Sequence, residues 1–401
     1  MGRLRALRVS GSLHPNPVSA QCGPANPGIH CCIGNGRVIR GSGDTVRATM
    51  RVLIDAVHPA DVWTLGAVED RLLDNGEETL WVSRPKKDSV VELIEARNRP
   101  HVRGPAAGTS LPGLARELLV RDWRVWRTVR SFEPDVILTR SPAGVHAGRF
   151  TRTPVMYDTD DGHVAGFLYY VAGPFANIIA SPTATEKNYG KQHRRYQGYK
   201  ELFYLHPSRF TPDPGIRAEL GLGDDEAFHV LRLTAFTASH DVSEAGMNRR
   251  QIDRVIERLS TTGTVLISSE QDLPLDLRDR RISSSAERFH HVLAAADLVV
   301  GDSQSVCSEA GVIGTPSLRF NTWAGRHPYQ VELEQRWGLT RAFLLEEEDA
   351  FFTELDRLLD DLPAAYARQA DGRDRMLAWC RDPVDDLTAW TYELAGRGAP
   401  D

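Results

Sequence analysis

Two serines and a glutamate stand close together in GDSQSVCSEAGVIGTP, residues 301–316, directly after an apolar run. The run is typical of a buried strand, and the following stretch is typical of a helix that ends near Gly314. A helix N-terminus has free N–H groups and a partial positive charge, so it attracts phosphate. Ser303 and Ser305 add hydroxyl donors, and Glu309, one turn beyond Ser305, could accept from ribose hydroxyls. The spacing therefore predicts a site for a nucleotide diphosphate.

Ordinary helix capping is the alternative interpretation of the same stretch. Asp302 or Ser303 would then be the N-cap and would accept from a backbone N–H. Capping does not account for Glu309, because the capping-box position three residues after Ser303 is Val306. A solvated helix residue remains the alternative for Glu309.

Further polar residues follow two other predicted strands of the second half. RLTAFTASHD supplies Arg232, His240 and Asp241, and the strand TVLIS is followed by Ser269 and Glu270. Arginine suits bidentate contact with phosphate, and a base or nucleotide edge could lie beside Glu270. Arg232, His240 and Glu270 are therefore predicted to bind the nucleotide, with a surface-loop position as the alternative for each.

Histidine and aspartate carry the chemistry predicted for the first half. DAVHPADVW places His58 in the first strand-to-helix loop, where it could be a general base or a diphosphate contact. The alternative is a residue at a helix N-terminus with no chemical task.

An acidic cluster follows a later strand of the first half. YDTDDGHVAG brings together Asp158, Asp160, Asp161 and His163. Close carboxylates raise one another's pKa, which suits acid–base work, so Asp160 and His163 join His58 as catalytic candidates. Mg²⁺ binding and a plain acidic turn with its corner at Asp161-Gly162 are the alternatives.

Arginine and tryptophan alternate in RDWRVWRTVR. Arg121, Arg124 and Arg127 lie about one helical turn apart, with Trp123 and Trp126 between them. This pattern suits a membrane interface or a lipid-linked acceptor. The alternative is a helix with a buried tryptophan stripe and a solvated basic face.

The elements that would position these residues alternate along the chain. Short apolar runs separated by helical patterns predict strands at 51–57, 78–83, 134–140, 153–160 and 175–181, and again at 227–236, 263–269, 297–303 and 316–321. Such alternation indicates parallel, doubly wound sheets. Ligands of these sheets bind beyond the C-terminal strand ends, and clefts between domains are common ligand sites.

The composition restricts the class of protein to which this chain can belong. The 401 residues are 41% hydrophobic, with a net charge of −6, which argues for a globular protein and against a dedicated nucleic-acid binder. Residues 1–49 differ: they hold six arginines and one acid, and they show no periodicity. We expect a mis-assigned extension before Met50, or a disordered basic tail. Three of the five cysteines lie in this segment, and the two others, Cys307 and Cys380, are too few for a disulfide framework, which favours a reducing cytoplasm. No apolar run is long enough to cross a bilayer.

The pattern D-S-x-S-x-x-x-E-A-x-x-x-G-T-P after a strand resembles the nucleotide-binding element of GT-B-fold proteins. Similar proteins are the non-hydrolysing UDP-N-acetylglucosamine 2-epimerases and related glycosyltransferases, where the serines bind diphosphate and the glutamate binds ribose. From residue 50 to about 345 the chain also resembles the GT-B-like domain-of-unknown-function family 354 of archaea and bacteria. The matching stretches include DAVHPADVW, DTDDGHVAG, YKELFYLHPSRFTPDP and RLTAFTASHD. The epimerase pattern departs at Gln304-Ser305, where that family has Gly-Gly.

The sequence thus predicts two Rossmann-like doubly wound domains that face a cleft, a GT-B-like α/β fold. The expected divisions are an extension at 1–49, domains at 50–195 and 216–373, a linker at 196–215 and a helix at 374–401 that crosses back. The expected function is sugar transfer from a UDP-type donor, without a cofactor or metal. The acceptor is unknown, with a lipid-linked one as an option, in the cytoplasm or at the membrane periphery. A 2-epimerase and a non-catalytic nucleotide-sugar binder are the alternatives.

Overall fold

The computed structural model describes residues 37–39, 45–47, 49–83, 88–103, 111–160, 172–234 and 246–400. Residues Met1–Ala48 and Thr49–Asp401 form separate compact units. Of the first unit, strands β1 (Arg37–Ile39) and β2 (Thr45–Arg47) are described, and they pair antiparallel.

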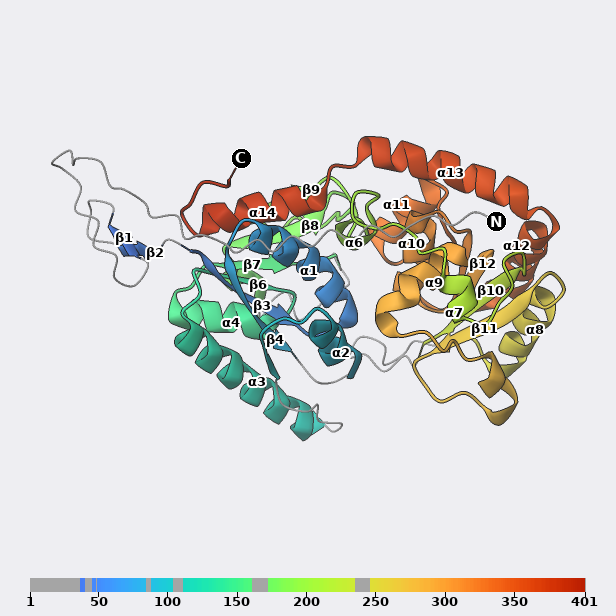
Figure 1. The fold of residues 1–401 in the computed structure, drawn as a ribbon, viewed down its shortest axis with the longest axis horizontal. Helices are drawn as coiled ribbons and strands as arrows, with labels where there is room; N and C mark the ends of the chain where they lie inside the picture. Colours follow the sequence, from blue (N-terminus) through green and yellow to red (C-terminus); the bar gives the residue numbers. More distant parts are fainter. Residues whose placement is uncertain are drawn as a thin grey trace, which may run out of the picture. The chain divides into compact units, whose positions relative to one another are not determined.

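The second unit contains two parallel sheets (Figure 1). The first has the order β5-β4-β3-β6-β7-β8-β9. Its strands are β3 (Arg51–Ala56), β4 (Glu78–Ser83), β5 (His101–Arg103), β6 (Val136–Thr139), β7 (Val155–Asp158), β8 (Ile178–Pro182) and β9 (His193–Tyr196). The second has the order β11-β10-β12-β13-β14. Its strands are β10 (Phe228–Leu233), β11 (Thr264–Ser269), β12 (Leu298–Gly301), β13 (Ser317–Phe320) and β14 (Arg341–Phe343).

Helices connect the strands as parallel pairing requires. Those of the first half are α1 (Pro59–Asp74), α2 (Asp88–Ala96), α3 (Leu111–Phe132) and α4 (Pro142–Thr151), with the short η2 (Gly173–Phe175), α6 (Leu202–Leu205) and α7 (Ile216–Glu219) after them. Those of the second half are α8 (Arg249–Leu259), η3 (Leu275–Arg280), η4 (Ala286–Arg288), α9 (Phe289–Ala295), α10 (Gln304–Ile313), α11 (Pro328–Gln335), η5 (Leu345–Glu347), α12 (Glu348–Asp360), α13 (Leu362–Trp379) and α14 (Pro383–Leu394). The α/β class predicted from the sequence is confirmed.

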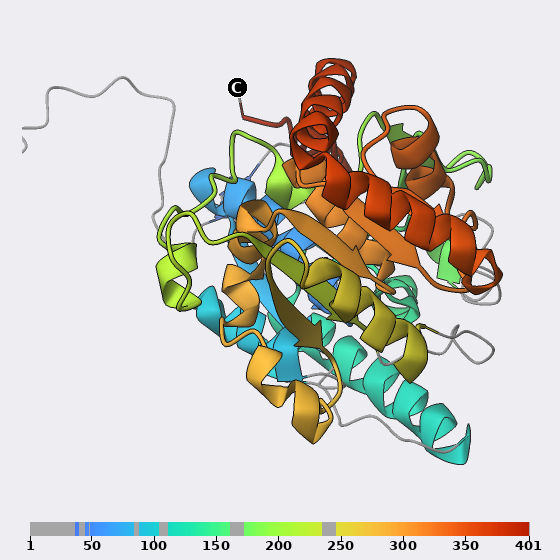
Figure 2. The same cartoon turned by 90° about the vertical axis from the view of Figure 1, so that its right-hand side faces the viewer.

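Side chains alternate between the two faces of the first sheet, as a strand requires. Val52 and Ile54 pack in a core with α1, α2 and α14, whereas Leu53 packs on the other face with α3 and α4. Figure 1 shows these helices as layers on the two faces. Figure 2 faces the second sheet, with the red C-terminal helices beside its orange strands.

The C-terminal helix α14 packs against the first half. Asp385 forms an ion pair with Arg71 of α1 at 3.0 Å, and the Tyr392 hydroxyl accepts from Asn75 at 3.2 Å. The chain therefore returns to its first sheet after it has completed the second. No helix in the described ranges is long and apolar enough to cross a membrane.

Candidate functional site

Ser303 is the N-cap of α10, directly after strand β12. Its hydroxyl accepts from the Val306 N–H at 3.5 Å, so the capping role holds for this residue. Ser305 lies half-buried in the first turn of the helix. Gly301 ends the strand, and a Cβ there would lie 2.6 Å from the Arg232 carbonyl oxygen, so only glycine fits. Strands β12 and β10 therefore approach each other closely just before the N-terminus of α10, where free N–H groups can bind an anion.

Two predicted nucleotide contacts, Arg232 and Glu270, lie together at the ends of the neighbouring strands β10 and β11. Arg232 donates to Glu270 Oε1 at 2.8 Å and to the Ser268 hydroxyl, also at 2.8 Å. Each therefore has a protein partner in this structure. The predicted residues His163 and His240, with Asp161 and Asp241, lie outside the described residues.

Glu309 is buried, with 6% of its surface exposed. Its Oε1 accepts from the Tyr204 hydroxyl at 2.8 Å and lies 3.6 Å from His290 Nε2. Burial raises the pKa of Glu309, but His290 and Tyr204 lower it more, so the net pKa lies below its usual value. The solvated-residue alternative is therefore wrong. Glu309 is instead an anion enclosed by aromatic rings, including Trp63, whose centroid lies 4.8 Å from that of His290.

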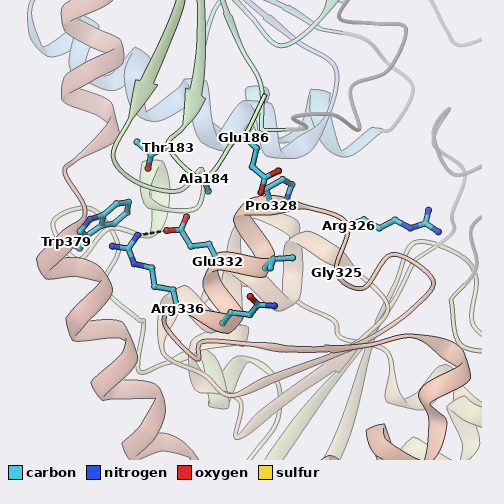
Figure 3. A pocket seen from close by; sticks show the side chains of 11 residues that line it. Thr183, Ala184, Glu186, Gly325, Arg326, Pro328, Glu332, Arg336 and Trp379 are labelled. Carbon is cyan, nitrogen blue, oxygen red and sulfur yellow. Dashed lines mark hydrogen bonds and ion pairs between the residues drawn. The ribbon is translucent and has the colours of Figure 1, made fainter. Parts of the chain in front are cut away.

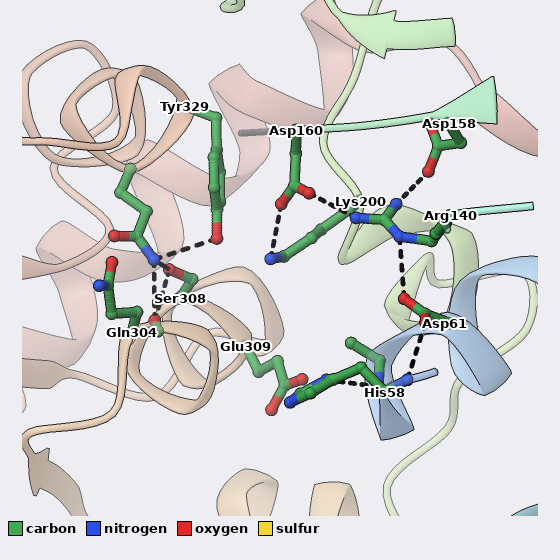
Figure 4. A network of polar contacts seen from close by, with 12 residues as sticks. His58, Asp61, Arg140, Asp158, Asp160, Lys200, Gln304, Ser308, Glu309 and Tyr329 are labelled. Carbon is green, nitrogen blue, oxygen red and sulfur yellow. Dashed lines mark hydrogen bonds and ion pairs between the residues drawn. The ribbon is translucent and has the colours of Figure 1, made fainter. Parts of the chain in front are cut away.

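His58 is the N-cap of α1, at the end of strand β3. Its Nδ1 accepts from the Ala60 N–H at 3.2 Å, and Asp61 accepts from the His58 N–H at 2.8 Å. Because Nδ1 accepts, the neutral ring carries its proton on Nε2, which is then a donor. Figure 4 shows this ring and the Glu309 carboxylate pointing toward one another. The geometry suits hydrogen-bond donation better than the general-base role predicted for His58.

Asp160 and Asp158 follow strand β7 and are held by cations. Arg140, at the end of β6, forms ion pairs with both carboxylates and a third with Asp61, at 3.0 Å. Lys200 Nζ lies 2.6 Å from Asp160 Oδ2. The structure thus pairs Asp158 and Asp160, the described members of the acidic cluster, with cationic side chains.

The charge states of the two aspartates differ. Burial raises the pKa of Asp160, but Lys200 and Arg140 lower it far more, so the net pKa falls well below its usual value. Burial raises the pKa of Asp158 to about 6, against the opposing effect of Arg140. Asp160 therefore stays ionised and suits a fixed charge better than the proton-transfer role predicted for it.

A polar chain continues from Lys200 to helix α10 (Figure 4). Lys200 Nζ lies 4.9 Å from the centre of the Tyr329 ring. Gln330 Nε2 donates to the Tyr329 hydroxyl at 3.0 Å, to the Ser308 hydroxyl at 3.1 Å and to the Gln304 carbonyl at 3.0 Å. The first turn of the candidate diphosphate helix is therefore linked to the acidic cluster of the first half.

Sequence reasoning missed the partners in this network. They are Arg140, Lys200, Tyr204, His290 and Gln330. Lys200 and Tyr204 lie in YKELFYLHPSRF, within the segment 196–215 that its Pro, Gly and aromatic content predicted to be a linker. Its apolar run, Leu202–Leu205, is buried, and that density of large side chains was the available signal.

Glu201, next to Lys200, is fully buried. Within the part of the chain that the structure describes, neither of its carboxyl oxygens has a hydrogen-bond partner. Burial raises its pKa to about 7, against the opposing effect of Lys200. Glu201 is thus one of three buried carboxyl groups here, with Asp158 and Asp302, whose pKa is raised toward neutral pH.

A pocket of about 740 Å³ lies beside the network. Its lining comes from residues that follow β8 and β13, from helix α11 and from the end of α13: Thr183, Ala184, Glu186, Gly325, Arg326, Pro328, Val331, Glu332, Gln335, Arg336 and Trp379. Figure 3 shows the ion pair of Glu332 and Arg336 near Trp379. His327, between two lining residues, contributes to the low pKa of Asp160. The pocket does not include Ser303, Ser305 or Glu309, so it adjoins the candidate diphosphate site rather than containing it.

The chain resembles known proteins in its fold rather than in its sequence. No known family model and no curated protein sequence matches the chain. The structure of a UDP-N-acetylglucosamine 2-epimerase from Neisseria meningitidis, bound to UDP-GlcNAc, superposes with a TM-score of 0.60 at 12% identity, covering 86% of this chain and 99% of that one. For the S. aureus MnaA–UDP structure the TM-score is 0.63 at 10% identity, with coverage of 88% and 100%. For the spinosyn rhamnosyltransferase SpnG with spinosyn aglycone it is 0.54 at 12% identity, with coverage of 84% and 99%.

At such low sequence identity, the similarity to these structures shows a shared fold only. The label of domain-of-unknown-function family 354 stays a prediction, since no family model matches. This chain has two parallel sheets, and its superposition covers nearly the whole of each of these structures. The chain therefore has a GT-B-like fold.

Proposed function

We propose that this protein transfers a sugar from a UDP-type nucleotide sugar. The observation that carries the proposal is the position of Glu309: a buried carboxylate one turn behind Ser305, at the N-terminus of a helix that follows a parallel strand. In this arrangement the α10 N–H groups and Ser305 would bind the diphosphate, and Glu309 would accept from the ribose. Two of the similar structures hold UDP or UDP-GlcNAc, which supports this class of donor.

The proposed roles follow from charge and proton position. A leaving diphosphate gains negative charge, which the N-terminus of α10 stabilises. The Nε2–H of His58 would donate to the bound donor, and Asp160 would hold Lys200 in place. His163, three residues after Asp160, remains the proposed base. Arg232, Glu270 and His240 remain proposed contacts of the nucleotide.

The pocket beside the network would hold the acceptor. It lies beyond the ends of β8 and β13, and His327 connects it electrostatically to Asp160. Its polar lining, with Glu186, Arg326 and Gln335, suits a hydroxyl-bearing acceptor group. A lipid-linked acceptor would place this group in the pocket and its chain outside.

Epimerisation of the same donor is the second candidate. Glu201 favours it, because a carboxyl group with a pKa of about 7 can give up and take back a proton at neutral pH. Inverting a carbon that bears hydrogen breaks its C–H bond, so UDP-N-acetylglucosamine incubated in D₂O would gain deuterium. Transfer would instead release UDP only when an acceptor or water is consumed. Binding without either product would indicate a nucleotide-sugar binder.

Calorimetric titration of UDP tests the shared step. Glu309→Gln should weaken binding about ten- to hundredfold, because a hydrogen bond to a charged acceptor is lost. Glu257→Gln, an exposed glutamate of α8, is the matched control. Tyr204→Phe removes the hydroxyl that now donates to Glu309 but keeps the carboxylate, so it reports the structural part of the loss. Unchanged affinity in a folded Glu309→Gln protein would contradict the proposal.

A further inference from the structure

Helix α3 presents tryptophan and arginine to the outside of the molecule. Trp123 is 52% exposed and Trp126 is 37% exposed. Arg127 lies over the Trp123 ring at 5.6 Å, and Arg130 lies over the Trp126 ring at 5.9 Å. These four residues recur at helical spacing and form one stripe, here named the α3 face.

The side of α3 that packs on the sheet is made of other residues. Val125, Val129 and Phe132 are buried in the core with strand β6 and helix α4. The expected buried tryptophan stripe is therefore wrong. Two indoles remain in contact with water although valines fill the core, and exposed large aromatic groups of this kind mark interaction surfaces.

Positive charge extends from the α3 face onto the neighbouring helix. Helix α4 packs beside α3, its last turn carries the exposed Arg149 and Phe150, and Arg152 follows the helix. Phe150 is 77% exposed. Helices that connect parallel strands in one direction end at the same edge of the sheet, so these residues lie beside the end of α3.

Two acidic residues, Asp122 and Glu133, lie near these arginines in the described part of α3 and in the turn after it. Asp122 of α3 is bonded to His146 at 2.9 Å. Among the residues the structure describes, Arg127 and Arg130 form cation–π contacts and no ion pair. A concentrated basic surface is unexpected on a chain whose net charge is −6.

We propose that the α3 face docks on an anionic membrane surface. Tryptophan prefers the level of the lipid headgroups, and arginine binds their phosphates. A helix surface that carries both residues is therefore better suited to the headgroup layer than to water. The face covers the side of the first sheet opposite α1 and α14. Docking there leaves the residues at the ends of the strands, with His58 and Asp160, free of the bilayer.

Co-sedimentation of the full chain with vesicles tests this proposal. Vesicles of phosphatidylcholine alone are compared with vesicles that also contain phosphatidylglycerol. The wild type should bind the anionic vesicles more tightly, and salt should weaken the binding. Arg127→Gln with Arg130→Gln should reduce the partition about 25-fold, at roughly fivefold per charge. Trp123→Ala with Trp126→Ala should reduce it about tenfold or more.

Matched controls separate the α3 face from charge or apolar exposure elsewhere. Leu275→Ala removes a side chain that is 79% exposed on η3, and Arg375→Gln removes an exposed arginine of α13. Both should bind as the wild type does. Melting temperatures of all variants are measured alongside, so that a loss of stability is separated from a loss of lipid binding.

Three results would overturn the proposal. The first is equal binding of the wild type and both α3-face variants, which would locate the lipid contact in another basic segment such as residues 1–49. The second is no binding to anionic vesicles at low salt. The third is an oligomer that the tryptophan variant converts to a monomer, which would make the face a contact between copies of this chain.

Discussion

At the scale of single residues, Glu201 contributes to how stability depends on pH. Its pKa is raised from 4.5 to about 7, so its stabilising contribution is complete below pH 4.5 and is lost as the pH rises through 7. A shift of this size corresponds to about 3 kcal/mol lost by about pH 8. Glu201→Gln resembles the protonated form and cannot ionise. We expect the variant to gain stability relative to the wild type as the pH rises.

Urea unfolding between about pH 5 and pH 8 measures this effect. Asp158 and Asp302, with pKa values raised by burial to about 6 and about 7, titrate in the same window in both proteins. The difference between the two proteins therefore isolates Glu201. Parallel stability curves would show that the wild-type carboxyl group does not titrate in this range.

The residue scale also shows where sequence reasoning reaches its limit. Ser303 and Glu309 were found because a helix start and its spacing are local patterns. Arg140 and Lys200 were missed because their partners lie 20 and 40 residues away along the chain, and only the folded sheet brings them to Asp160. The position of His58 in the sequence also could not reveal that its Nδ1 accepts from the backbone. That contact favours hydrogen-bond donation by Nε2 over the predicted general-base role.

At the scale of elements, Gly372 lets helix α13 pack against the turn before β14. A Cβ on this residue would lie 2.1 Å from the Trp337 carbonyl oxygen. Gln369, one turn earlier, donates to the carbonyls of Gly311 at 2.9 Å and Leu339 at 2.7 Å. Alanine favours a helix over glycine, but the backbone contact leaves no room for its methyl group. Gly372→Ala should therefore cost about 1–3 kcal/mol.

Thermal unfolding measures this cost, with Arg368→Ala as the control because Arg368 is exposed on the same helix. The control should change stability by less than about 0.5 kcal/mol. If Gly372→Ala were instead more stable by about 1 kcal/mol, it would behave as an open helix position, and the close approach would be absent.

Elements were predicted better than their connections. Apolar runs and helical periodicity are local, so both parallel sheets followed from them, whereas the GT-B-like class followed from the resemblance of residues 301–316 to a known nucleotide-binding element. The segment 196–215 was different, because its Pro, Gly and aromatic content indicated a linker. In the structure it contains α6, and Tyr199, Leu202 and Phe203 are fully buried. Aromatic side chains outweigh turn residues once other elements are present to cover them.

At the scale of the whole molecule, the second compact unit begins at Thr49, and Met50 is its first buried residue. The Met50 side chain is fully buried in the core with α1 and α14. Its backbone N–H donates to Glu77 Oε2 at 2.5 Å. This contact gives a test of whether the basic extension contributes to the stability of the unit.

A chain that starts at Met50 would place its α-ammonium group beside the Glu77 carboxylate and so replace a neutral donor with a charged one. The ammonium group adds Coulomb attraction to a hydrogen bond whose acceptor is already charged, so residues 50–401 should melt at the same temperature as the full chain or higher. Glu77→Gln removes the charge in both versions, although it also weakens the bond from the Tyr392 hydroxyl. Both chains lose part of the bond from Tyr392. Glu77→Gln should therefore lower the free energy of unfolding of residues 50–401 by about 1 kcal/mol more than that of the full chain. Calorimetric melting of the four proteins measures the difference. A large fall in melting temperature on truncation would mean that residues before Met50 stabilise the unit, and the extension would not be dispensable.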